Sequence, residues 1–487
     1  MNQLKFKHVL IVVAILGLVE AVSFLGFRVP AIGQVAFLAT TVLTAILTWR
    51  RLETGLLILF AELFMGGKGY LLSYDLGDDR LSIRIAVFVV VLATWLIKHR
   101  GPGNPFKYIP PVYRRWLVLL GIIVAFGVIN GLIRHRGAGT VYFDANAFLF
   151  FGLVPVLFAP SINWRRQAVR TMTILAAAAI ILGIKSLFSL GIFAHLEPGQ
   201  LTNYYRWIRT TGVGEIAYIN GNSYRVFFQS QIFGLFAAFI LAALLLPSSQ
   251  GRLRQWWLMV PIILGTTAVM ISLSRSFWIG GAVGALAGTT LAWRHWRWTI
   301  RQALFTIGLG TLAVAYTLTS WALHFQYPFP PSKDSATAKL IGQRFQALGG
   351  EAAASSRLNQ LKPLRDGIIE HPVIGSGFGT KLTYMSNDPR QQQSPDRGIF
   401  TTTAFEWGYL DLTLKLGLLG LAAYLGLLWI IMSKLWKHSS RLSFGILLAI
   451  LSLSVVHVTT PYLNHPIGIG LLLLGMSLGT SYREDYS

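Results

Sequence analysis

The chain has 487 residues, of which 54% are hydrophobic and 13% are Asp, Glu, Lys or Arg, and it contains no cysteine. A soluble domain carries about 25% charged residues, so this composition excludes an ordinary soluble protein and indicates a membrane protein. The absence of thiols excludes disulfides, iron–sulfur clusters and thiolate zinc sites. The net charge of +23 is explained by basic cytoplasmic loops, without nucleic-acid binding.

Apolar runs long enough to cross roughly 30 Å of hydrocarbon recur along the chain. They predict an all-α polytopic membrane protein with about fourteen transmembrane helices, of which two runs are short. The runs are 8–27, 31–49, 52–66, 81–98, 114–133, 146–160, 167–190, 225–246, 255–273, 276–293, 300–321, 404–432, 442–460 and 464–480. Residues 1–321 are thus predicted as a helix bundle with short loops, 322–403 as a large, partly helical periplasmic loop, and 404–487 as C-terminal transmembrane helices.

Basic residues gather on alternate loops that contain almost no acid, which marks those loops as cytoplasmic. Examples are Arg50 and Arg51 after the second run, and Lys434 and Lys437 after the twelfth. The remaining loops, which include 67–80 and 191–224, hold most of the acidic residues and are predicted to lie outside.

The segment 322–403 is too long for a structureless loop and is expected to carry its own elements. Between Glu351 and Glu370, apolar residues at near-helical spacing predict one or two amphipathic helices over the outer mouth of the bundle, with Pro363 as a possible interruption. Further on, IGSGFG (374–379) predicts a tight turn after His371-Pro372, because no βαβ pattern surrounds its glycines.

Some charges fall inside predicted spans rather than loops: Glu20, Glu62, Lys185 and Lys415. The first three lie toward the outer half, which favours a water-filled cavity open to the outside. The alternative for each residue is a snorkelling side chain or a satisfied hydrogen bond between helices. No metal site is predicted, since the acidic 75–79 loop lacks the spacing of a dedicated cation site.

Two arginines on the outer side are not explained by the charge bias of cytoplasmic loops. Arg225 opens the span after the 191–224 loop, and Arg275 occupies a very short turn between two apolar runs. A guanidinium group offers a planar fork of donors that matches phosphate oxygens, so this pair could hold a diphosphate at headgroup level. Headgroup anchoring of helix ends is the alternative. Arg206 and Arg209, beside aromatic residues, resemble a surface that contacts sugars or headgroups.

Glu406 lies where the large loop re-enters an apolar segment, AFEWGYLDLTLKLGLLG (404–420). An ionisable group at the edge of a membrane helix is a functional candidate. The alternative is a carboxylate that stabilises the N-terminal end of the helix dipole.

Three motifs then occur in order: SRSFWIGGAVG, SSRLNQLKPLRDGIIEHPVIGSGFG and YLDLTLKLGLLGLAAYL. In this order and spacing they resemble the O-antigen ligase and polymerase family of multi-pass bacterial glycan enzymes, over about 270–430. The resemblance implies a fold like that of the C-type glycosyltransferases and transfer of a glycan from undecaprenyl diphosphate to a hydroxyl acceptor at the outer face of the inner membrane.

The resemblance also implies roles for individual residues. Arg225 and Arg275 stand where the family's diphosphate-binding arginines are expected. Aligning back from Gly417 to Gly420 puts Glu406-Trp407 at the positions of the ligase branch's His-Asn pair, which favours a polymerase-like member with Glu406 as the general base. The predicted catalytic residues are Glu406, Arg275 and Arg225, and the predicted substrate-binding residues are Arg206, Arg209, Tyr224, Arg357 and Tyr409. Arginines would then stabilise the leaving diphosphate without a metal or cofactor.

The sequence hypothesis is a polymerase of lipid-diphosphate-linked repeat units of O-antigen or exopolysaccharide. A ligase that moves finished glycan to lipid A core or protein, and a lipid or polysaccharide transporter, are the alternatives. The expected partners are the lipid-linked donor, the glycan acceptor and membrane lipids, with a chain-length regulator or flippase as further candidates and no nucleic acid. The expected location is the bacterial inner membrane, with the large loop in the periplasm.

Overall fold

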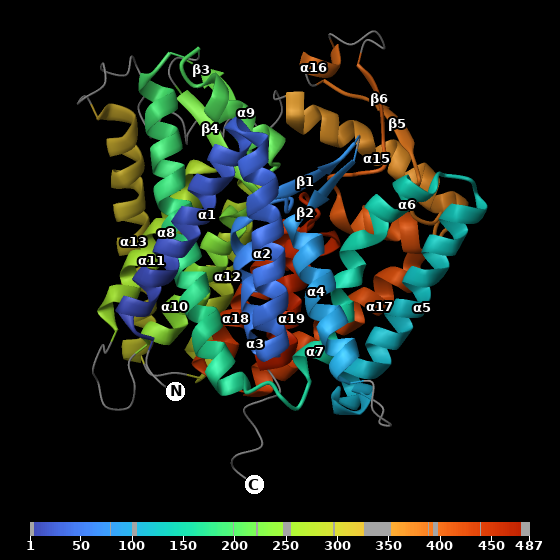
Figure 1. Ribbon diagram of the computed structural model, residues 1–487, viewed down its shortest axis with the longest axis horizontal. Coiled ribbons are helices and arrows are strands. Elements are labelled where there is room, and N and C mark those ends of the chain that lie inside the picture. Colours follow the sequence, from blue (N-terminus) through green and yellow to red (C-terminus); the bar gives the residue numbers. More distant parts are fainter. Residues whose placement is uncertain are drawn as a thin grey trace.

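The computed structural model describes residues 4–77, 79–99, 105–197, 199–220, 223–246, 255–295, 298–325, 352–387, 389–392, 398–438 and 440–478. Helices make up most of these residues (Figure 1). In the first half they are α1 (Phe6–Arg28), α2 (Pro30–Arg50), α3 (Leu52–Met65), α4 (Ile83–Lys98), α5 (Pro111–Ile133), α6 (Ala138–Ala145), α7 (Val154–Leu157), α8 (Trp164–His195), α9 (Thr202–Thr210) and α10 (Ile232–Leu245). In the second half they are α11 (Met259–Ile271), α12 (Arg275–His295), α13 (Trp298–His324), α15 (Ala352–Glu370), α16 (Pro389–Gln392), α17 (Gly408–His438), α18 (Arg441–Val456) and α19 (Pro466–Leu478).

Short 3-10 helices and strands connect the long helices. The 3-10 helices are η1 (Pro105–Tyr108), η2 (Asn146–Leu153), η3 (Gln229–Gln231), η4 (Trp256–Leu258) and η5 (Tyr462–Asn464). The strands pair as three antiparallel hairpins: β1 (Ser73–Leu76) with β2 (Asp79–Ser82), β3 (Gly214–Asn220) with β4 (Ser223–Phe228), and β5 (Leu382–Met385) with β6 (Ile399–Thr402). The prediction of an all-α chain therefore missed three hairpins, because four- to seven-residue strands give a weak period-2 signal beside long apolar runs.

Among the residues that the structure describes, six helical stretches are long and apolar enough to cross a membrane: α1, α2, α5, the stretch Ala138–Leu157, α8 and α17. In the most apolar windows of α1, α2 and α5, only 17% of the residues are buried inside the protein. Large apolar side chains such as Leu18 and Val35 therefore face outward, which is stable in lipid and unfavourable in water. The chain is a multi-pass membrane protein.

Each of the fourteen predicted runs overlaps a helical segment, and two of the runs differ from the prediction over much of their length. Residues 146–160 fold mainly as η2 and α7, and the start of 225–246 is part of β4, so that α10 begins only at Ile232. Helices α10, α11, α18 and α19 are apolar but have fewer than 18 residues each. The structure thus supports a polytopic helical bundle without fixing the number of crossings at fourteen.

Figure 1 shows that all three hairpins, α9 and α15 gather at one end of the bundle, drawn at the top, whereas α7 lies toward the other end. The segments predicted to lie outside thus share one end. Helix α15 spans Ala352–Glu370 without a break at Pro363, so the expected interruption does not occur.

Small residues allow the central helices to approach closely. A Cβ atom built on Gly234 of α10 would lie 2.5 Å from the carbonyl oxygen of Gly265 in α11, and one on Gly265 would lie 2.9 Å from that of Gly234. The alanines at 176–179 of α8 are fully buried. Close backbone packing of this kind is a common source of attraction between membrane helices, where no hydrophobic effect drives association.

Helix α17 contains a break at Gly417, whose φ of 69° and ψ of −175° are accessible almost only to glycine. The segment after α15 enters this break. Ser376 N–H donates to the Leu414 carbonyl (2.7 Å), and Leu418 N–H donates to the Pro372 carbonyl (2.8 Å). The IGSGFG segment, predicted as a tight turn, has its three glycines at positive φ and also supplies hydrogen-bond partners for the broken helix. A Cβ on Gly375 would lie 2.5 Å from Gly417 N.

Candidate functional site

Glu406 lies two residues before α17 and contacts the large-loop helix α15. Its carboxylate forms an ion pair with Arg357, and both side chains are partly exposed, at 46% and 37% respectively. Two backbone contacts hold the same segments together. Glu406 N–H donates to Gln360 Oε1 (3.1 Å), and Trp407 Nε1–H donates to the Arg357 carbonyl (2.8 Å). The structure therefore brings together two predicted site residues that are 49 positions apart in the chain.

Arg225 lies in β4, not at the start of a membrane helix as predicted. The sequence SYRVFF is rich in aromatic and β-branched residues and pairs with β3, placing Arg225 opposite Ala217. Its Nε–H donates to the Ser272 carbonyl (3.1 Å), and its guanidinium carbon lies 4.8 Å from the centre of the Phe227 ring. Arg225 is thereby held against the turn that precedes Arg275.

Arg275 is the first residue of α12 and follows a turn of unusual geometry. The buried Leu273 in this turn has a positive φ of 48°, a conformation that strains residues other than glycine. Ser274 and Ser276 flank Arg275, and their hydroxyl oxygens are 3.0 Å apart. Because Arg225 donates to Ser272, the two arginines predicted to bind diphosphate belong to one contiguous group of residues.

The connection between α18 and α19, residues 457–465, contacts this arginine group. Thr460 Oγ1–H donates to Ser276 Oγ (3.0 Å), the rings of Tyr462 and Phe277 lie 5.7 Å apart, and Tyr462 O–H donates to the Gln229 carbonyl (2.8 Å). These contacts tie the connection to the start of α12 and to the segment that follows β4.

The same 457–465 connection contacts the start of α17. The ring of His457 meets that of Tyr409 edge to face at 4.6 Å, and a Cβ on Gly408 would lie 2.4 Å from the His457 ring. Asn464 Nδ2–H donates to Asp411 Oδ2 (2.8 Å). A single nine-residue segment therefore lies between the residues around Arg275 and those that follow Glu406.

Of the other predicted substrate-binding residues, some are exposed and others contact neighbouring side chains or helices. Arg206 is exposed on α9, and Arg209 forms a partly exposed ion pair with Glu215 (2.9 Å). Tyr224 packs against Phe193, and burial raises the pKa of its phenol. Tyr409 lies inside α17 and donates its hydroxyl to the Ser454 carbonyl (2.9 Å), so its hydroxyl connects two helices.

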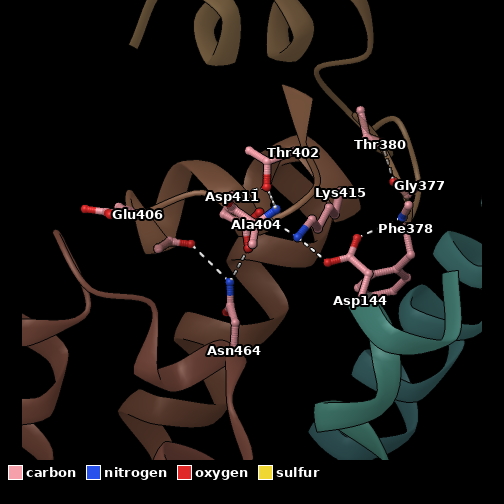
Figure 2. Close-up of polar contacts among 12 residues, drawn as sticks. Asp144, Gly377, Phe378, Thr380, Thr402, Ala404, Glu406, Asp411, Lys415 and Asn464 are labelled. Carbon is pink, nitrogen blue, oxygen red and sulfur yellow. Dashed lines mark hydrogen bonds and ion pairs between the residues drawn. The ribbon is translucent and has the colours of Figure 1, made fainter. Parts of the chain in front are cut away.

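A buried polar cluster lies beside Glu406 and was not predicted as a unit (Figure 2). Lys415 Nζ lies 2.6 Å from Asp411 Oδ1 and also contacts Asp144 Oδ1, with all three side chains at most 8% exposed. Asp144 Oδ2 accepts from Gly379 N–H (2.8 Å). Figure 2 shows that the Glu406 side chain points away from this cluster.

Part of this cluster could have been found from the sequence. Asp411 and Lys415 are four residues apart, a spacing that places opposite charges on one face of a helix. Asp144 is 271 positions from Lys415, and no local pattern connects them. Only the packing of α6 against the outer part of the bundle brings this second carboxylate to the ammonium group.

Each of the four charges singled out inside predicted spans has an oppositely charged partner. Lys185 Nζ contacts both oxygens of Glu20 (2.8 and 2.9 Å), and Arg84 binds Glu62 through two hydrogen bonds (2.7 and 3.0 Å). Lys415 has the two carboxylate partners described above. These contacts match the alternative of satisfied interactions for all four residues, so the four residues give no support for an outward cavity, which stays a prediction.

In the described parts of the chain, no three His, Asp or Glu side chains gather in a way that could hold a metal ion. The acidic hairpin between β1 and β2 instead contains an ion pair between Asp75 and Arg80 (3.0 Å).

These features define a multi-pass helical membrane protein with a polar site at one end of its bundle. The sequence model of one protein family, described as O-antigen ligase, matches residues 260–425. The matched segment includes Arg275, Arg357 and Glu406, whereas Arg225 lies before it. The match confirms the resemblance to the O-antigen ligase and polymerase superfamily over about a third of the chain. A comparison with curated proteins finds no match.

Proposed function

We propose that this protein is a glycosyltransferase of the inner membrane that polymerises undecaprenyl-diphosphate-linked repeat units of O-antigen or exopolysaccharide at the periplasmic face. The family match supports an enzyme acting on lipid-linked glycans. The observation that carries the proposal is the double contact of the 457–465 segment, which touches both the start of α12 near Arg275 and the start of α17 near Glu406. This contact supports the proposal, because one segment touches the immediate neighbours of both the proposed diphosphate-binding arginine and the proposed base.

In the proposed reaction, a hydroxyl oxygen of the acceptor glycan attacks the anomeric carbon of the donor. The bond between that carbon and the diphosphate oxygen breaks, and its electron pair leaves with undecaprenyl diphosphate. Arg225 and Arg275 stabilise the departing charge, an effect worth about 100- to 1,000-fold in rate for one well-placed donor. Glu406 accepts the proton of the attacking hydroxyl, an effect of about 100- to 10,000-fold. The reaction as proposed requires no metal.

The runner-up function is a ligase that transfers finished glycan to lipid A core or to a protein. The family description names this activity. The presence of Glu406-Trp407 at the positions of the ligase branch's His-Asn pair favours the polymerase. A chain-length regulator or a flippase would be a reasonable partner for either enzyme.

A reconstituted assay with one defined undecaprenyl-diphosphate glycan separates these functions. A ladder of products supports the polymerase. A single conjugate on a supplied lipid A core or protein acceptor supports the ligase and refutes the polymerase. Intact donor moved across the bilayer, with no new glycosidic bond, indicates a transporter and refutes both enzymes.

A further inference from the structure

The Arg357–Glu406 ion pair joins a residue suited to bind phosphate with the proposed general base. We propose that the donor's diphosphate and the Glu406 carboxylate compete for Arg357, so that donor binding releases Glu406 for proton transfer. This inference rests on the proposed function. In this proposal Arg357, which lies on the large loop, couples donor binding to exposure of the general base Glu406.

The two atoms that form the ion pair are buried, but the exposure of the rest of both side chains makes such an exchange feasible. Both side chains are more than a third exposed, and ion pairs of this kind are typically worth only about 0.2–1 kcal/mol. A diphosphate offers a guanidinium group more charge and more acceptor oxygens than one carboxylate does. An anionic ligand at this end of the bundle can therefore replace Glu406 as the partner of Arg357.

The backbone contacts around the ion pair do not depend on it. The Gln360 side chain accepts from Glu406 N–H, and the Trp407 side chain donates to the Arg357 carbonyl. Below them, Leu364 of α15 packs with Phe405 and Leu414 in a buried apolar cluster. Helix α15 thus stays docked on the start of α17 when the two charged side chains separate, and the exchange needs only rotation of side chains.

The neighbouring carboxylates cannot serve in the same way. Asp411 and Asp144 share Lys415 in a buried cluster, where removal of one partner is strongly unfavourable. Among these three carboxylates, Glu406 alone has a partly exposed cationic partner, which a ligand can reach.

The test measures binding of undecaprenyl diphosphate without a sugar to the purified full-length protein in nanodiscs. Glu406→Gln removes the competing charge and should tighten binding about two- to fivefold, the equivalent of a weak surface ion pair. Arg357→Ala should weaken binding about tenfold, as expected for loss of a charge-assisted hydrogen bond. The double variant should bind as weakly as Arg357→Ala alone, because Glu406 then has no shared partner to release.

Asp366→Asn is the matched control. Asp366 forms an exposed ion pair with Arg365 on the same helix, and its replacement should leave the affinity unchanged. Should Arg357→Ala fail to fold, Arg357→Gln, which removes the charge and keeps a polar side chain of similar length, replaces it in the comparison.

Three results would overturn the inference: unchanged or weaker binding by Glu406→Gln, tightening by Glu406→Gln that persists in the Arg357→Ala background, or no binding by the unmodified protein. The proposed function is judged separately, by product ladders from the glycan-bearing donor. If the protein makes polymer but the binding effects of the two substitutions are additive, the proposed function stands and the inference fails. If the binding measurements show the competition but no polymer forms, Arg357 is shared between Glu406 and a diphosphate, and the proposed polymerase function fails.

Discussion

Two groups of paired charges lie at the start of α17, and they differ in exposure. The Arg357–Glu406 pair is partly exposed, whereas Lys415, Asp411 and Asp144 are buried together. An exposed pair contributes little to stability and can be broken by a ligand. A buried pair is costly to disrupt from one side, since an unpaired charge remains in a dry environment. The proposed function and the further inference therefore rest on the partly exposed pair, whereas the buried cluster is expected to support the structure.

The largest expected effect is on turnover. Glu406→Gln removes the proposed base, and the transfer rate should fall by about 100- to 10,000-fold. The folded protein should persist, because the side chain is half-exposed. The initial rate of polymer formation, followed on gels, measures the transfer rate, and thermal unfolding in detergent measures the stability of the fold. Near-normal long-chain polymer would refute the base assignment.

Lys415→Met tests whether the buried cluster of Lys415, Asp411 and Asp144 stabilises the fold. Two carboxylates would lose their cationic partner, and the protein should be destabilised by about 3–5 kcal/mol. Thermal unfolding and the yield of folded protein report this loss. The exposed Lys362 of α15 supplies the control, since Lys362→Met should change stability by less than about 0.5 kcal/mol. Equal stability of the two variants would contradict the structural role of the cluster.

Gly417→Ala tests whether the break in α17 is needed for a stable fold. The φ of 69° and ψ of −175° at this position strain any residue with a Cβ, by about 1–3 kcal/mol, and the added atom would lie 2.2 Å from the Val373 carbonyl oxygen. A lower unfolding temperature is expected. Gly121→Ala serves as the control, because a Cβ there meets nothing within 4 Å. A neutral Gly417→Ala variant would show that the break is not needed for folding.

The smallest of these effects is expected at the arginine group. Arg275→Lys keeps the charge and loses the fork, so affinity for undecaprenyl diphosphate should fall about five- to tenfold while acceptor affinity is unchanged. Binding assays with each substrate measure the two quantities. Unchanged donor affinity would remove Arg275 from the proposed diphosphate site.

The sequence was sufficient for features that depend on local composition. Apolar runs fix where helices form, because a segment in lipid must satisfy its own backbone hydrogen bonds. The motifs around Arg275 and Glu406 were enough to predict the family resemblance, which the family match at 260–425 confirms. The assignments of catalytic roles to Arg225, Arg275 and Glu406 remain predictions.

Tertiary structure decided which charges meet. Local patterns extend over a few residues, whereas Asp144 reaches Lys415 across 271 positions and Glu20 reaches Lys185 across 165. Glu20, Glu62 and Lys185, which suggested a water-filled cavity, proved to be paired, because tertiary packing supplied partners that their spacing in the sequence could not reveal. The same holds for Arg357: the sequence identified it as a candidate, and only the docking of α15 on the start of α17 placed it against Glu406.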